Sequence, residues 1–166
     1  MPTGGPGGDP LTAAGRSALM ARVRTRDTAP EVAVRRALWA LGVRGWRLHP
    51  RGVAGKPDLV WHGPRLAVFV DGAFWHGHPD AYHGQSGPFW DTKIAANRAR
   101  DARVNDELTG GGWTVVRLWD FEVEREPVRC AEAVARVLGG LRDGDAALAG
   151  RVLGVEEAGD VPGEAP

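Results

Sequence analysis

The chain contains a single cysteine, Cys130, among its 166 residues. One thiol excludes a disulfide within the chain and a zinc site built from several cysteines. No run of about 18 apolar residues is present, and no charged segment followed by an apolar one opens the chain. Neither a membrane span nor a secretory signal is therefore expected, and the expected location is the cytoplasm.

The chain also lacks net charge, but its charges are unevenly distributed. Lys and Arg outnumber Asp and Glu by 16 to 10 between Arg16 and Asp120, whereas the remaining residues are acidic by 11 to 5. A basic central region could bind a polyanion, because backbone phosphates attract Lys and Arg whatever the base sequence. An arginine-rich solvated surface balanced by an acidic tail explains the same pattern.

Glycine and proline are concentrated toward the two ends of the chain. Residues 1–15 are too rich in both to pack, and residues 141–166 are small and acidic, so both ends are expected to be disordered. Residues 16–140 are expected to form one small domain. Neither end is expected to carry chemistry.

Local patterns predict the elements of that domain. Thr28, Pro30 and Glu31 form a helix start with a capping box, and Gly42 ends the apolar pattern that follows. Further helices are expected at about 90–108 and from Pro127, and strands at 59–61, 66–70 and 113–119. Residues 62–65 form the turn of a hairpin. The order predicts a small mixed α/β domain.

The segment from Gly55 to His78 is the most informative part of the chain. Asp58 opens the first strand of the hairpin and Asp71 closes the second, with His76 shortly after. Two carboxylates at strand ends can hold a hard divalent cation such as Mg2+, which leaves other positions to water and phosphate. Phosphodiester hydrolysis is therefore the first reaction to consider, although an Asp after Pro is often only a turn residue.

Five separated motifs resemble one known family. In order they are RVRTRDTAPE, GKPDLVW, VFVDGAFWHGH, FWDTKIAANRARD and GWTVVRLWD. Together, over roughly residues 17–121, they are similar to the very short patch repair (Vsr) DNA mismatch endonucleases, which nick DNA beside a T·G mismatch. The resemblance implies the fold of the PD-(D/E)xK nuclease superfamily. That fold is restriction-endonuclease-like, with a mixed central β-sheet flanked by helices.

The resemblance also implies a catalytic site. It assigns Mg2+ to Asp58 and to the backbone of Val70, and it makes His76 a catalytic histidine. Imidazole can accept a proton from water or give one to a leaving oxygen, and both roles for His76 remain open. Asp71 stands where some members have histidine, so it either contacts the metal or orients His76. Glu31 is either a helix cap alone or also a ligand through water.

The DNA contacts follow from the same resemblance. Intercalation between base pairs from the major groove is implied for Phe74, Trp75 and Trp90, and an aromatic wedge suits the weak stacking of a mismatch. Lys93 is assigned to the same interface, and the N-terminal segment to the minor groove through Met20, Arg22, Arg24 and Arg26. The partner is double-stranded DNA with a T·G mismatch, bound by a monomer.

A structural zinc site common in the family is altered in this chain. His78 and Asp101 are retained, but Asp80 and Phe121 stand where thiols are expected. Phe121 cannot bind zinc, and structural zinc sites use mostly thiolate and imidazole. His78, Asp80 and Asp101 could form only a degenerate site, so structural Zn2+ is doubtful.

Two other functions fit these residues. One is a restriction-like nuclease of the PD-(D/E)xK type that cuts undamaged DNA. The other is a DNA-binding domain with a decayed active site, which the joint retention of Glu31, Asp58 and His76 disfavours. The flanking sequence preference depends on which side chains meet which base edges, and no motif reveals it.

Overall fold

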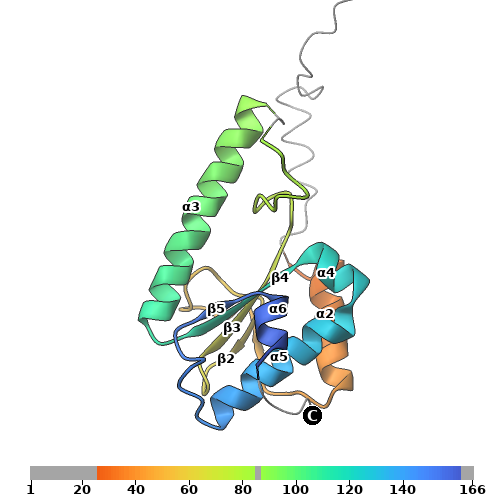
Figure 1. Ribbon diagram of the computed structural model, residues 1–166, viewed down its shortest axis with the longest axis vertical. Coiled ribbons are helices and arrows are strands. Elements are labelled where there is room, and N and C mark those ends of the chain that lie inside the picture. Colours follow the sequence, from red (N-terminus) through yellow and green to blue (C-terminus); the bar gives the residue numbers. More distant parts are fainter. Residues whose placement is uncertain (1–25, 85–86, 162–166) are drawn as a thin grey trace, which may run out of the picture.

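The computed structural model of the protein describes residues 26–84 and 87–161. A five-stranded sheet of order β1-β2-β3-β4-β5 lies at its centre, with helices on both faces (Figure 1). β1 pairs with β2 and β2 with β3 in antiparallel fashion, whereas β3 pairs with β4 and β4 with β5 in parallel fashion. The predicted restriction-endonuclease-like architecture, a mixed sheet flanked by helices, is confirmed.

The strands are β1 Arg47–Leu48, β2 Leu59–Trp61, β3 Leu66–Asp71, β4 Thr114–Trp119 and β5 Val152–Leu153. The helices are α2 Ala29–Ala40, α3 Pro88–Gly110, α4 Asp120–Arg125, α5 Pro127–Arg142 and α6 Val155–Gly159. None of the helices in the described part of the chain is long and apolar enough to cross a membrane.

Helix α2 begins and ends where the sequence predicts. The Thr28 hydroxyl accepts a hydrogen bond from the Glu31 backbone N–H at 3.4 Å, and Pro30 occupies the first turn. Glu31 does not close the capping box in the usual way, because its carboxylate accepts from the Asp27 backbone N–H instead. At the other end Gly42 takes a positive φ of 79°, and the following N–H bonds back to Leu38, as in a Schellman cap.

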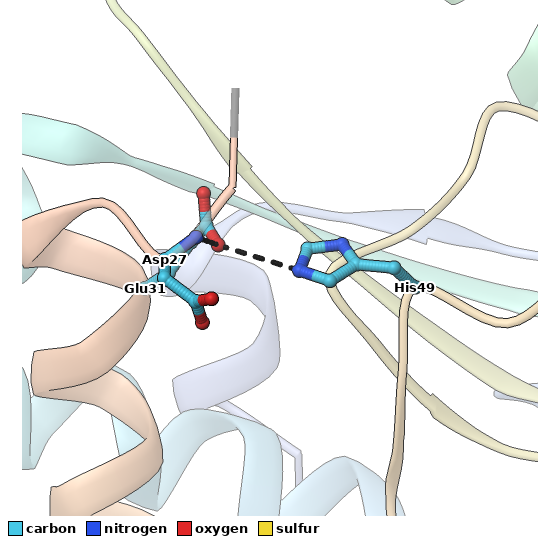
Figure 2. Close-up of side chains that lie close together, drawn as sticks. All are labelled: Asp27, Glu31 and His49. Carbon is cyan, nitrogen blue, oxygen red and sulfur yellow. Dashed lines mark hydrogen bonds and ion pairs between the residues drawn. The ribbon is translucent and has the colours of Figure 1, made fainter. Parts of the chain in front are cut away.

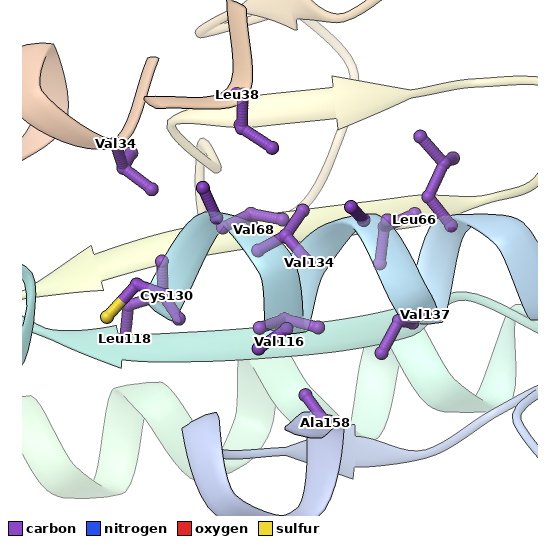
Figure 3. Packing of buried hydrophobic residues seen from close by; sticks show 14 of the residues in the cluster. Val34, Leu38, Leu66, Val68, Val116, Leu118, Cys130, Val134, Val137 and Ala158 are labelled. Carbon is purple, nitrogen blue, oxygen red and sulfur yellow. The ribbon is translucent and has the colours of Figure 1, made fainter. Parts of the chain in front are cut away.

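Both faces of the sheet are buried, because helices cover each of them. Side chains alternate along each strand, so neighbouring residues pack on opposite faces. On one face Leu66, Val68, Val116 and Leu118 pack against α2, α5 and α6, and Figure 3 shows Val134 and Val137 of α5 over these strands. On the other face the alternate residues pack against α3, which stands alone on that side (Figure 1). Cys130 is buried on α5.

The predicted disorder of residues 141–166 is wrong over residues 141–161. Helix α5 continues to Arg142, β5 pairs with β4, and α6 packs on α5 and β4. Small and acidic residues hid a sparse apolar pattern whose members are buried in the main core: Leu148, Leu153, Val155, Ala158 and Val161. Residues 1–15 and 162–166, also predicted to be disordered, lie outside the described residues.

The strand connections bring the predicted catalytic residues to one edge of the sheet. β3 and β4 run parallel, so both end at that edge, where Asp71 is the register partner of Trp119. β2 is antiparallel to β3, and its start therefore lies beside the end of β3, with the Asp58 N–H bonded to the Val68 carbonyl. Asp58 and Asp71 therefore lie near each other and line the same hollow, although the hairpin separates them in the sequence.

Candidate active site

Asp58 lies half-buried where β2 begins, against the end of β3. Its Oδ2 accepts a hydrogen bond from the Val70 backbone N–H at 2.7 Å, and its Oδ1 lies 3.6 Å from Nδ1 of His49. Burial raises the pKa of Asp58 to about 7, against the lowering effect of the Val70 hydrogen bond, and the Glu31 and Asp71 carboxylates raise it further. The pocket therefore holds a carboxylate whose negative charge is poorly stabilised.

Glu31 and His49 complete this side of the site (Figure 2). The Glu31 carboxylate is buried at the start of α2, with Oε2 3.7 Å from Nε2 of His49. Glu31 is therefore both a helix-start residue and a neighbour of Asp58 through the His49 ring. His49 was not predicted, because a histidine in a loop before Pro50 has no local signature of a site.

The donor atoms on this side suit a divalent cation. Asp27, Glu31 and His49 offer ligand atoms within 4.8 Å of one another, and no other group of three or more His, Cys, Asp or Glu with this spacing occurs in residues 26–84 and 87–161. Nε2 of His49 is buried without a hydrogen-bond partner among the described residues. The half-buried carboxylate of Asp58 and the buried carboxylate of Glu31 are oxygen donors that a hard cation would stabilise, and a cation would also satisfy the bare His49 nitrogen.

His76 lies on the other side of Asp58, in the turn after β3. Its Nδ1 donates to Oδ2 of Asp101 on α3 at 2.5 Å, and its Nε2 lies 3.7 Å from Oδ1 of Asp71. Burial lowers the pKa of His76, but the Asp101 hydrogen bond and the charges of both carboxylates outweigh burial, so the pKa lies above 6.5. The ring therefore carries its second proton more readily at neutral pH than a free histidine does.

Asp71 is buried and contacts His76 and Arg117. Arg117 Nη1 donates to Oδ2 of Asp71 at 2.6 Å, which leaves Oδ1 toward the imidazole. Burial raises the pKa of Asp71, and Arg117 and His76 oppose that rise. These contacts favour the prediction that Asp71 orients His76 over a direct metal contact.

A groove of about 530 Å3 joins these groups. From the sheet and α2 it is lined by Glu31, Asp58, Val70 and His76, and from α3 by Lys93, Asn97 and Arg100. Asp71, Asp101 and Arg117 line a smaller hollow of about 170 Å3, to which Asp58 and His76 also belong. The structure therefore brings together all four residues predicted to be catalytic, together with Lys93.

The three aromatic residues predicted to contact DNA form one cluster. Ring centroids lie 5.3 Å apart for Phe74 and Trp75, 5.8 Å for Phe74 and Trp90, and 5.5 Å for Trp75 and Trp90. Trp75 lines the groove, whereas Trp90 is buried and supports the other two rings. Phe89 was not predicted to contact DNA, yet it is 48% exposed and packs against Trp90.

The predicted minor-groove residues lie mostly beyond the structure. Met20, Arg22 and Arg24 are outside the described residues, and Arg26 is exposed just before α2. Arg26 therefore lies on the same side of the molecule as the helix start that carries Glu31.

The three residues of the degenerate zinc site do not form one group of metal ligands, although Nδ1 of His78 lies 4.0 Å from Oδ2 of Asp80. The Asp101 carboxylate points to His76 and Arg117, and Asp80 is exposed. The His78 ring instead packs edge-on against Trp119 and Phe121, at centroid distances of 4.8 and 5.0 Å. Phe121, one of the two residues that stand where thiols were expected, packs against His78, and these residues do not fit zinc.

Comparison with known proteins gives consistent matches. The family model described as DNA mismatch endonuclease Vsr matches residues 8–82. The chain is 43% identical over 119 residues to the type II nicking enzyme V.XorIIP of Xanthomonas oryzae pv. oryzae, covering 69% of this chain and 86% of that protein. The type II nicking enzyme V.NmeDIP of Neisseria meningitidis serogroup C is 37% identical over 134 residues, which cover 78% of this chain and 90% of that protein. The DNA mismatch endonuclease Vsr of Escherichia coli K12 is 33% identical over 108 residues, which cover 63% of this chain and 69% of that protein.

Proposed function

The chain belongs to the Vsr family of DNA mismatch endonucleases, and from that membership we propose that it nicks one strand of duplex DNA beside a T·G mismatch. The reaction is Mg2+-dependent phosphodiester hydrolysis in very short patch repair, carried out by a monomer in the cytoplasm. One observation supports the proposal above others: Glu31, Asp58 and His76 line a single groove. A decayed site would have no reason to retain all three around one opening.

The carboxylates of Asp58 and Glu31 are oxygen donors of the kind that Mg2+ prefers. Asp58 and the backbone of Val70 would hold the ion, with Glu31 acting through water. When bound, the ion supplies Lewis-acid polarisation of the scissile phosphate and stabilises its developing charge. Lys93 and Arg100 face these groups from α3 and attract the phosphate backbone into the groove.

His76 supplies the proton chemistry. Asp101 holds Nδ1, so Nε2 is the nitrogen that remains for substrate. Because the pKa of His76 is raised, the protonated ring is more populated at neutral pH than in a free histidine. This favours a role as the acid that gives its proton to the leaving oxygen, while water attacks from the opposite side.

Replacing His76 by Gln is expected to lower the nicking rate by roughly 10²- to 10⁴-fold, the usual contribution of general acid–base catalysis. In the unchanged protein at saturating Mg2+, the proton-donor role requires the rate to fall as pH rises through a pKa above 6.5. A pH profile of kcat/KM measures both effects. A rate that rises through that range would assign His76 the role of base.

Phe74→Ala is expected to reduce the preference for T·G over matched duplex about tenfold, since stacking of one base on an aromatic ring contributes about 1–3 kcal/mol. Mg2+ binding should not change, because Phe74 contacts neither Asp58 nor Glu31. Nicking rates on the two duplexes give the preference. The matched control is Trp39→Ala, because Trp39 is 60% exposed at the end of α2, under the Arg44 guanidinium.

One experiment separates the three functions. Matched and T·G-containing duplexes, each labelled on either strand, are incubated with the protein and Mg2+ and run on denaturing gels. A nick in one strand of only the mismatched duplex supports the proposal. Cuts in both duplexes support a restriction-like nuclease, and binding without cuts supports a decayed domain.

A further inference from the structure

Arg117 is a half-buried cation on an inner strand of the central sheet. It lies on β4, on the face toward α3, and its side chain is only 14% exposed. A guanidinium in such a place is costly unless its donors are satisfied. Its Nε donates to Asn105 at 3.0 Å and its Cζ lies 4.5 Å above the Phe69 ring. Its two Nη atoms face carboxylates.

Those carboxylates are the two that flank His76. Nη1 donates to Asp71 Oδ2 at 2.6 Å, and Nη2 lies 3.8 Å from Asp101 Oδ1. The remaining oxygen of each carboxylate faces one ring nitrogen: Asp71 Oδ1 lies near Nε2 and Asp101 Oδ2 accepts from Nδ1. His76, Asp101, Arg117 and Asp71 therefore form a closed ring of contacts from four separate segments.

The hydrogen bond from Nδ1 to Asp101 fixes the imidazole, whereas Asp71 Oδ1, at 3.7 Å from Nε2, is too far for a hydrogen bond and leaves that nitrogen for the groove. A planar guanidinium has donors in a rigid fork, so it can set the direction of two carboxylates at once, which an ammonium cannot do. It also offsets the repulsion between the buried carboxylate of Asp71 and the half-buried carboxylate of Asp101. Arg100 lies 3.6 Å from Asp101, but it is 57% exposed and has no contact with Asp71 among those described, so it cannot replace Arg117.

We propose that Arg117 is a positioning residue, which holds Asp71 and Asp101 so that His76 presents Nε2 to the groove. The inference rests on the proposed function in taking His76 as the proton-transferring group. It assigns a role to Arg117 that neither its sequence context nor its place in a strand indicates. Arg117 itself acts through His76.

The kinetic test compares Arg117→Met and Arg117→Lys with Arg129→Met, which also removes an arginine between two carboxylates but lies on α5 away from the groove. Arg117→Met is expected to lower kcat for T·G nicking about a hundredfold, the scale of a small misplacement of a catalytic group. KM and duplex affinity should stay within about twofold of the unchanged protein. Lys should restore only part of the rate, because it lacks the fork.

Circular dichroism identifies the variants that fold. If Arg117→Met does not fold, the kcat of Arg117→Lys is the quantity that tests the proposal. An unchanged kcat in a folded Arg117→Met variant, or full activity with Lys, overturns the proposal. Arg129→Met should behave as the unchanged protein.

Nitrogen-15 NMR of the His76 ring tests the positioning without catalysis. The unchanged protein should show one fixed form with a proton on Nδ1, and Arg117→Met should show shifted or exchange-averaged ring signals. Identical ring spectra in the two proteins contradict the inference. If the unchanged protein fails to nick DNA but the ring spectra differ, the proposed function fails and the positioning role survives.

Discussion

Asp58→Asn is expected to reduce Mg2+-dependent nicking by roughly a thousandfold or more while leaving the fold intact. Loss of the carboxylate removes the negative charge that would hold the ion, and metal stabilisation of transition-state charge contributes several kcal/mol. The fold should survive because the Asn carbonyl can still accept the Val70 hydrogen bond that Asp58 makes at 2.7 Å. Single-turnover rates on a T·G duplex measure the loss.

Calorimetric titration with Mg2+ should show weakened binding in the same variant. Asp106→Asn, an exposed acid on α3, is the matched control and should keep both properties. Near-normal nicking by a folded Asp58→Asn protein would remove Asp58 from the reaction, whatever happened to metal binding.

The second large effect concerns stability without metal. The pKa of Asp58 is about 7 in the folded protein and 3.8 as a reference, so the folded state binds the proton more tightly. Its contribution to stability is fully present below pH 3.8 and is lost as pH rises to about 7. Three pKa units correspond to an upper bound of about 4 kcal/mol. Metal-free Asp58→Asn should therefore be more stable than the unchanged protein at pH 8 and equally stable near pH 4.

Urea unfolding at several pH values, with chelator and then with Mg2+, measures this difference. Mg2+ should reduce the difference in unfolding free energy between the two proteins at pH 8, because an ion bound only to the folded state of the unchanged protein stabilises that state. A difference between the two proteins that does not vary with pH would show that Asp58 is an ordinary surface carboxylate.

Features set by neighbouring residues could be predicted from the sequence. The cap at Thr28, the stop at Gly42 and the strands beside Asp58 and Asp71 depend on local pattern, and each lies where expected. The proximity of Asp58 to Asp71 could also be predicted, because a hairpin places the start of its first strand beside the end of its second. The role proposed for His76 rests on the resemblance to a family, because a histidine after a tryptophan has no local signature of a catalytic site.

Features that depend on distant contacts could not be predicted. Arg117 interrupts an apolar strand, and its partner Asp71 is 46 residues away. His49 gains its meaning only when the loop after β1 folds against α2. The order of residues 141–161 is not evident from their composition, because it depends on a few apolar side chains that are buried against β4 and α5.

Strand β5 has a practical consequence for anyone shortening this protein. It covers the outer edge of β4 with backbone pairs at Val115 and Val116. Trimming the chain at the apparent domain end near residue 140 would leave a bare apolar strand that invites pairing between molecules and precipitation. Affinity tags and fluorescent fusions belong after Val161.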